Sequence, residues 1–256
     1  MRIDDDHRFV FKHEGITHSV YRDGQGPAVL LMHELPGMSP KCIEVAGRLI
    51  GKGFSVYLPL FFGEPRQHSV VRGLAGTAWL CVRHELNALS TDGRSEISVW
   101  LRALCRRMLG ECGGRGVGVI GMCLTGHLVI SVMLDESVLV PVLCEPSIPL
   151  VAITEKQRAA LGVPQEDVAR AVERAKSAPV LGFRFVPDKR CPPERFETLK
   201  ELFGTCFQGS SLPVDPRDPH AAKPPHSVLT EDFVDQPEHP TRKAFDAIVE
   251  RLGTLR

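Results

Sequence analysis

The feature that most constrains the fold is an alternation of short, almost wholly apolar runs with longer amphipathic segments. The run 28–32 is followed by a helix start at Ser39, with Pro40 at the first helical position, and a second apolar run begins at Phe54. Strands that are apolar on both faces are typical of buried parallel sheets, because helical crossovers cover both sides. These segments predict one βαβ unit.

The same alternation continues to the C-terminal end. It predicts strands from residues 117, 137 and 179, and helices over 95–109 and 124–133 and from residues 164, 192 and 241. We therefore expect an α/β chain with a doubly wound, mostly parallel sheet and helices on both faces, formed by residues 1–256 as a single domain. Two segments depart from the pattern: 63–92, expected as a lid or helical insertion, and 209–240, expected as a proline-rich loop.

Charge and hydropathy exclude several classes of partner. The 31 Lys and Arg residues balance 31 Asp and Glu residues, so no excess of positive charge favours nucleic acid. No run approaches the ~20 apolar residues that a membrane span needs, and the N-terminal residues do not resemble a signal peptide. We expect a cytoplasmic monomer or homodimer without nucleic-acid or membrane partners.

The eight cysteines are scattered singly, without the close Cys and His spacing of zinc sites, so we expect no metal. In a reducing compartment each cysteine is either a small core residue or a reactive thiolate. The question is therefore which of them is reactive.

Cys123 has the most distinctive surroundings. In the segment GMCLTG, it lies between the apolar run from Val117 and a helical segment from Leu124. This strand–turn–helix context is typical of a nucleophile elbow. The positive end of the helix dipole is expected to lower the pKa of the thiol, and the N–H of Leu124 is available to an oxyanion. Taken alone, the motif fits a buried small residue at a tight junction equally well.

Two further residues, much later in the chain, complete a candidate triad. A thiolate nucleophile needs a base for its proton and an acid that orients the base. Asp188 lies just beyond a predicted strand, where catalytic groups collect in open α/β sheets, and His226 lies in a loop with two preceding prolines. Cys123, Asp188 and His226 follow one of the known chain orders of such triads. Singly, a helix cap and a solvated loop residue are the simpler interpretations of Asp188 and His226.

Four motifs together resemble the dienelactone hydrolases. GMCLTG is similar to the nucleophile motif of that family with cysteine in the usual serine place, HELPG to the loop after its early strand, DKRCP to its acid motif and PHS to its histidine motif. The resemblance implies an α/β-hydrolase fold that cleaves a small ester or lactone through a thioester, without a cofactor. It implies Cys123 as nucleophile, His226 as base, Asp188 as orienting acid, and Leu35 and Leu124 as oxyanion-hole N–H donors.

Three further positions bear on the substrate and on thiol activation. The resemblance implies that Glu34 accepts the thiol proton when substrate displaces it, although an ion pair with an arginine or a helix cap is also open. The best-known members hold a substrate carboxylate with an arginine where this chain has Thr230, so a carboxylate on the substrate does not follow. Arg83 is the remaining candidate for a cationic substrate contact.

The leading hypothesis is therefore hydrolysis of a small ester or lactone. Acyl transfer or thioester hydrolysis by the same three residues is the first alternative. A hydrolase-like fold that binds a ligand without turnover is the second.

Overall fold

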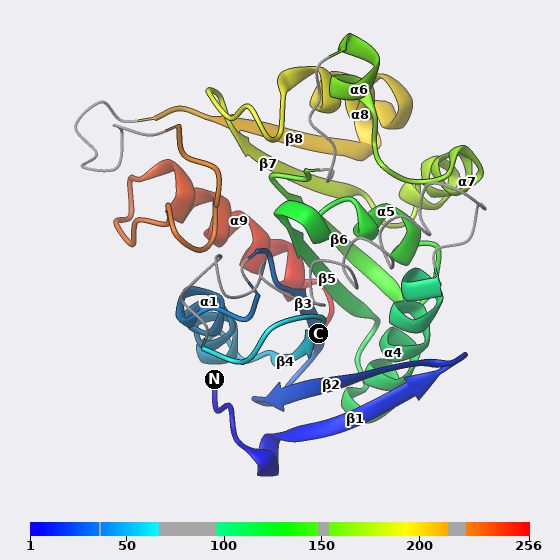
Figure 1. Ribbon diagram of the computed structural model, residues 1–256, viewed down its shortest axis with the longest axis vertical. Coiled ribbons are helices and arrows are strands. Elements are labelled where there is room, and N and C mark those ends of the chain that lie inside the picture. The colour runs from blue at the N-terminus through cyan, green and yellow to red at the C-terminus, as the bar shows by residue number, and fades with distance from the viewer. Residues whose placement is uncertain (36, 67–95, 148–153, 215–223) are drawn as a thin grey trace.

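Strand β3 (Ala28–Met32) is buried over its whole length, as its unbroken apolar sequence predicts. Its side chains alternate between two cores, since Leu30 packs into one and Val29 and Leu31 into the other. The computed structural model describes residues 1–35, 37–66, 96–147, 154–214 and 224–256. Within those residues, β3 lies in the middle of a single sheet with a core on each face (Figure 1).

The other strands span Arg8–His13 (β1), Ile16–Asp23 (β2), Ser55–Leu60 (β4), Val117–Met122 (β5), Val138–Cys144 (β6), Val180–Phe185 (β7) and Phe207–Leu212 (β8). In the described chain, their order across the sheet is β1-β2-β4-β3-β5-β6-β7-β8. The pairs β1–β2 and β2–β4 are antiparallel, and the pairs from β4 to β8 are parallel. The carboxyl ends of β3, β5, β6 and β7 therefore lie at one edge.

Helices cover both faces of the sheet, which confirms the predicted doubly wound architecture (Figure 1). Helices α1 (Pro40–Gly51) and α9 (Pro240–Gly253) pack on one face. Helices α4 (Glu96–Cys112), α5 (Leu128–Val132), α7 (Gln165–Ala175) and α8 (Pro193–Phe203) pack on the other. The short α6 (Glu155–Ala159) packs against α8. Single 3₁₀ turns are formed by Asp5–His7 (η1), Cys123–Thr125 (η2) and Gly204–Cys206 (η3).

The structure differs from the sequence expectation in three places. The hairpin of β1 and β2 was not predicted, and the helix expected over 124–133 is divided into η2 and α5. Strand β8 runs to Leu212, because it pairs along its whole length with β7, so strand occupies the start of the expected loop 209–240. Residues 67–92 of the expected lid and 215–223 of the loop lie outside the described residues.

Over the described ranges, the longest helices are too short or too polar to cross a membrane.

Candidate active site

Polar side chains gather where four parallel strands end. Glu34 follows β3, Cys123 follows β5, Glu145 follows β6 and Asp188 lies shortly after β7. His226 approaches the same edge from the chain that precedes α9. All five side chains are 6% exposed or less. Buried ionisable groups at this edge of an α/β sheet are typical of functional sites, because burying charge without a role is costly.

Cys123 stands at a strained turn. Its φ is +50°, in the left-handed region that residues with a Cβ seldom adopt. The residue is the first of the 3₁₀ turn η2, directly after β5, so the backbone reverses at the sulfur-bearing residue. This is the elbow geometry that the sequence motif predicts.

Close packing of backbone makes this turn possible. A Cβ at Gly121 would lie 2.5 Å from the Thr125 carbonyl oxygen, and a Cβ at Gly126 would lie 2.8 Å from the Cα of Pro146. The Thr125 hydroxyl donates to the Met32 carbonyl at 3.0 Å, so it ties the elbow to the end of β3. The β-branched Thr125 is therefore accommodated by a hydrogen bond from η2 to β3, while the glycines allow the close approach.

His226 and Asp188 form a buried hydrogen-bonded pair. Nδ1 of the histidine donates to Oδ2 of the aspartate at 2.7 Å, and the other ring nitrogen, Nε2, has no hydrogen-bond partner within the described residues. Burial opposes charging of the ring, but the hydrogen bond to Asp188 and the neighbouring Cys123 raise the pKa of His226 to about 11. Asp188 does not cap the following helix, whose N-cap is Pro192.

Glu34 faces the loop that carries the histidine. Its Oε2 accepts a hydrogen bond from the Ser227 hydroxyl at 2.8 Å, and its Oε1 accepts one from Thr230. Burial raises its pKa, against the effect of these two donors. Helix α1 is capped by Ser39 instead, so neither of the alternative roles considered for Glu34 applies among its observed contacts.

Ligand atoms of Glu34, Cys123 and His226 all lie within 4.8 Å of one another. The structure thus brings together the candidate nucleophile, the candidate base and the candidate proton acceptor, which are remote in the sequence. The His226 pairing adds Asp188 to this group.

Two residues of this cluster were missed by the sequence analysis. Glu145 is wholly buried at a φ of +37°; its Oε2 accepts from the Val228 N–H at 3.2 Å, and its Oε1 has no partner within the described chain. Ser147 lies with its Oγ 3.1 Å from Sγ of Cys123. Glu145 follows a predicted strand just as Glu34 does, and that shared position was the available signal.

The expected oxyanion-hole residues lie at the ends of neighbouring strands. Leu124 is the second residue of η2. The first hydrogen bond of that turn runs from the Gly126 N–H to the Cys123 carbonyl, so the turn does not use the N–H of Leu124. Leu35 begins a turn after β3 and its side chain is partly exposed. Arg83 lies outside the described residues.

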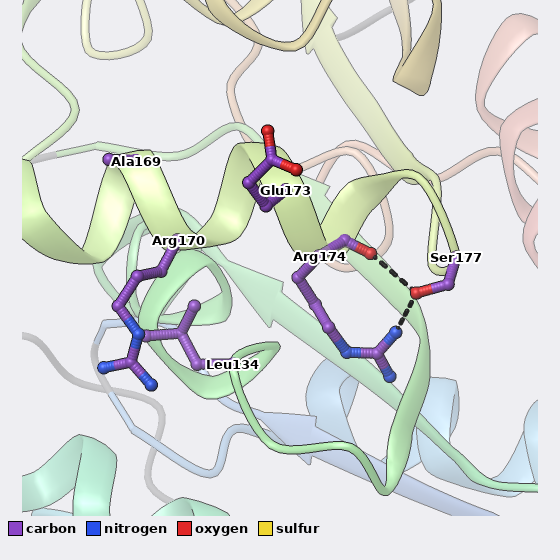
Figure 2. Close-up of a pocket in the computed structure, with 6 residues that line it drawn as sticks. All are labelled: Leu134, Ala169, Arg170, Glu173, Arg174 and Ser177. Carbon is purple, nitrogen blue, oxygen red and sulfur yellow. Dashed lines mark hydrogen bonds between the residues drawn. The ribbon is translucent and has the colours of Figure 1, made fainter.

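A surface pocket lies elsewhere on the molecule. Figure 2 shows it over α7 and the chain after α5, lined by Leu134, Ala169, Arg170, Glu173, Arg174 and Ser177. None of the clustered residues lines it, so it forms no part of the candidate active site.

The fold is shared with solved esterases and related hydrolases. A cold-adapted esterase from an Arctic intertidal metagenomic library is 18% identical, with a TM-score of 0.61, 95% of this chain covered and 92% of that chain. A dienelactone hydrolase-like promiscuous phosphotriesterase from metagenomic libraries is 12% identical, with a TM-score of 0.61 and 97% of both chains covered. A thioesterase domain from the curacin biosynthetic pathway is 14% identical, with a TM-score of 0.53, 96% of this chain covered and 98% of that chain.

No family model matches the chain, and no curated protein matches it. The structural similarity establishes the α/β-hydrolase fold over nearly the whole length of the chain.

Proposed function

We propose that this chain is a dienelactone hydrolase-like enzyme that hydrolyses small esters or lactones, with Cys123 as nucleophile. The observation that carries the proposal is that Cys123, at a strained turn, lies close to the hydrogen-bonded His226–Asp188 pair at the carboxyl ends of the strands. The shared fold of solved esterases supports it.

The reaction begins with attack of the Cys123 thiolate on the substrate carbonyl carbon. The carbonyl π electrons move to oxygen, and the N–H groups of Leu35 and Leu124 stabilise the resulting oxyanion. One such donor contributes roughly 2.7–4 kcal/mol of transition-state stabilisation in related chemistry. The tetrahedral intermediate collapses to a thioester when the alkoxide leaves with a proton from Nε2 of His226.

Hydrolysis of the thioester uses the same imidazole as a base. Nε2 of His226 removes a proton from water, the hydroxide attacks the thioester carbon, and the thiolate leaves. Asp188 holds the ring with Nε2 toward the sulfur and stabilises the imidazolium. No step needs a cofactor.

Glu34 acts on the thiol proton before attack. Burial raises the pKa of its carboxyl, which makes it a stronger base toward a thiol than an exposed glutamate. Its carboxylate is held by Ser227 and Thr230, so a substrate that disturbs these hydrogen bonds frees it to accept the proton.

A panel of short aryl esters and small lactones tests the proposal. Wild-type protein is expected to hydrolyse at least one member, Cys123→Ala to lose that activity, and Ser147→Ala to keep most of it. Ser147 is the matched control because its hydroxyl lies beside the sulfur. Undiminished hydrolysis by Cys123→Ala would remove the cysteine from the mechanism.

Acyl transfer or thioester hydrolysis by the same residues is the second candidate, favoured by the fold shared with a thioesterase domain. Product analysis with added alcohol or thiol acceptors separates the two. Transfer yields a new ester or thioester, whereas hydrolysis yields only the free acid.

A further inference from the structure

Three different metal-binding side chains converge at the candidate active site. The Cys123 sulfur, a carboxylate oxygen of Glu34 and a ring nitrogen of His226 lie within 4.8 Å of one another, and all three residues are buried. Thiolate, imidazole and carboxylate are the ligand types that Zn²⁺ takes in proteins. The sequence analysis expected these three residues in one catalytic site but expected no metal, because the cysteines lack the close Cys and His spacing of zinc sites.

The distances between the three ligand atoms suit a zinc ion once they shorten slightly. Zinc–ligand bonds of about 2.0–2.3 Å place the ligand atoms of a tetrahedral site roughly 3.3–3.8 Å apart. A separation of 4.8 Å therefore has to shorten by about 1–1.5 Å. The Cys123 and Glu34 side chains have to rotate for this.

His226 is already oriented as a metal-binding histidine is. Its Nδ1 donates to the Asp188 carboxylate at 2.7 Å, and its Nε2 is buried without a hydrogen-bond partner in the described structure. Metal-bound histidines usually carry a carboxylate, carbonyl or water on the other ring nitrogen, which fixes the tautomer and orients the ring. Asp188 supplies this second interaction.

The surrounding charges also favour a cation. Ser227 and Thr230 donate to Glu34, which leaves the carboxylate oxygens with further lone pairs. Glu145 interacts electrostatically with Glu34, Cys123 and His226, and its Oε1 has no partner among the described residues. A bound divalent ion would neutralise the negative charge of the Glu34 carboxylate and of the Cys123 thiolate.

We propose that Cys123, His226 and Glu34 form a binding site for Zn²⁺ or a similar thiophilic divalent ion, and that the bound ion inhibits the enzyme. On binding, Sγ of Cys123 and Nε2 of His226 release any protons they carry to solvent, and each donates a lone pair to the metal, while Nδ1 keeps its proton on Asp188. The nucleophile and the base are then both blocked. The inhibition rests on the proposed function, whereas the binding does not.

Metal binding is measured first, without reference to activity. Chelator-treated protein is titrated with Zn²⁺ against a chromophoric chelator, and with Co²⁺ while the thiolate-to-cobalt charge-transfer absorption is followed. The wild type is expected to bind one ion per chain with this absorption. Cys123→Ala should lose the absorption, and Glu34→Gln and His226→Gln should weaken zinc binding by at least tenfold.

Cys206→Ala is the matched control. Cys206 is a half-buried free thiol that directly precedes β8, at the opposite edge of the sheet from the cluster. This variant should bind zinc as the wild type does. Loss of zinc in Cys206→Ala, or wild-type zinc affinity in Cys123→Ala, would overturn the site.

Ester hydrolysis is then compared with and without zinc. The proposal expects full activity in the presence of a chelator and loss of activity at one equivalent of zinc, restored by chelator. Higher activity with zinc would overturn the inhibitory role. If no ester is hydrolysed under any condition but the three variants lose zinc, the proposed function fails while the metal site stands.

Discussion

Nδ1 of His226 lies 2.7 Å from Oδ2 of Asp188, with both side chains at most 4% exposed. In water each partner could exchange this hydrogen bond for one to a water molecule. Here both side chains are buried, so the carboxylate fixes the orientation of the ring. Nε2, which has no hydrogen-bond partner among the described residues, is thereby directed toward the part of the site that holds the sulfur. The proposed base depends on this one hydrogen bond for its orientation.

Asp188→Asn should remove that orientation with little change in shape. An amide in this position favours the wrong tautomer, and the precedent of a buried aspartate in a serine protease triad suggests a fall in kcat of roughly 10³–10⁴-fold. The measurement is steady-state hydrolysis of the best ester substrate. Asp135→Asn, which alters a carboxylate bonded to Ser137 before β6, is the control and should keep kcat within a few-fold. An equal fall in kcat in the two variants would show that it comes from a loss of stability and not from the orientation of His226.

The buried histidines should differ in charge at neutral pH. Burial lowers the pKa of His33 and of His127 to about 4, whereas Asp188 and Cys123 raise that of His226 above its ordinary value of 6.5. Nitrogen NMR of the rings at pH 7 should find His226 doubly protonated and the other two neutral. Cys123→Ala should lower the pKa of His226. A neutral His226 ring at pH 7 in the wild type would show that Asp188 and Cys123 do not raise its pKa above that pH.

Packing at the elbow should make Gly121 intolerant of a methyl group. A Cβ there would also lie 2.7 Å from Cγ2 of Val129, so Gly121→Ala should destabilise the protein by roughly 1–3 kcal/mol. Gly110 in α4 is exposed with open space around it, so Gly110→Ala should stabilise by about 1 kcal/mol. Urea unfolding measures both. A stable Gly121→Ala protein would show that the elbow is looser than the structure describes.

Glu145 should make the stability fall as the pH rises. Burial raises its pKa well above 4.5 in the folded protein, so above that pH the native state holds a proton that the unfolded chain has lost. The free energy of unfolding therefore decreases with pH through this window. Glu145→Gln keeps an acceptor for the Val228 N–H but has no titration.

The stability gained by Glu145→Gln over the wild type should consequently grow between pH 5 and pH 8. Urea unfolding at the two values gives the difference directly, and contributions from groups distant from Glu145 cancel in it. A gain that shrinks as the pH rises would mean that Glu145 is ionised in the folded protein and stabilised by its surroundings.

The central strands and the elbow were predictable because their signals are local. β3 and β5 are continuous apolar runs, and Cys123 stands between one of them and a helical segment. The β1–β2 hairpin was missed because its first strand alternates exposed and half-buried residues and contains two basic residues. Its signal was the run of strand-favouring residues Phe9, Val10 and Phe11 shortly before Gly15.

The partners within the site were only partly predictable. The order of Cys123, Asp188 and His226 was visible in the sequence, whereas the hydrogen bond from Thr230 to Glu34 joins positions 196 residues apart. No local pattern encodes such a contact, because it depends on how the last loop folds over the sheet edge. That Oε1 of Glu145 has no partner in the described part of the chain is a property of packing in the same way.

The most direct test of the account is to identify the residue that becomes acylated. The protein is mixed with an activated aryl acetate, quenched within the first turnovers, digested at acidic pH and analysed by mass spectrometry. We expect a burst of the phenol and an acetyl group on Cys123 that hydroxylamine removes. Acetylation of Ser147 instead, or steady turnover by Cys123→Ala with no acyl-enzyme, would contradict it.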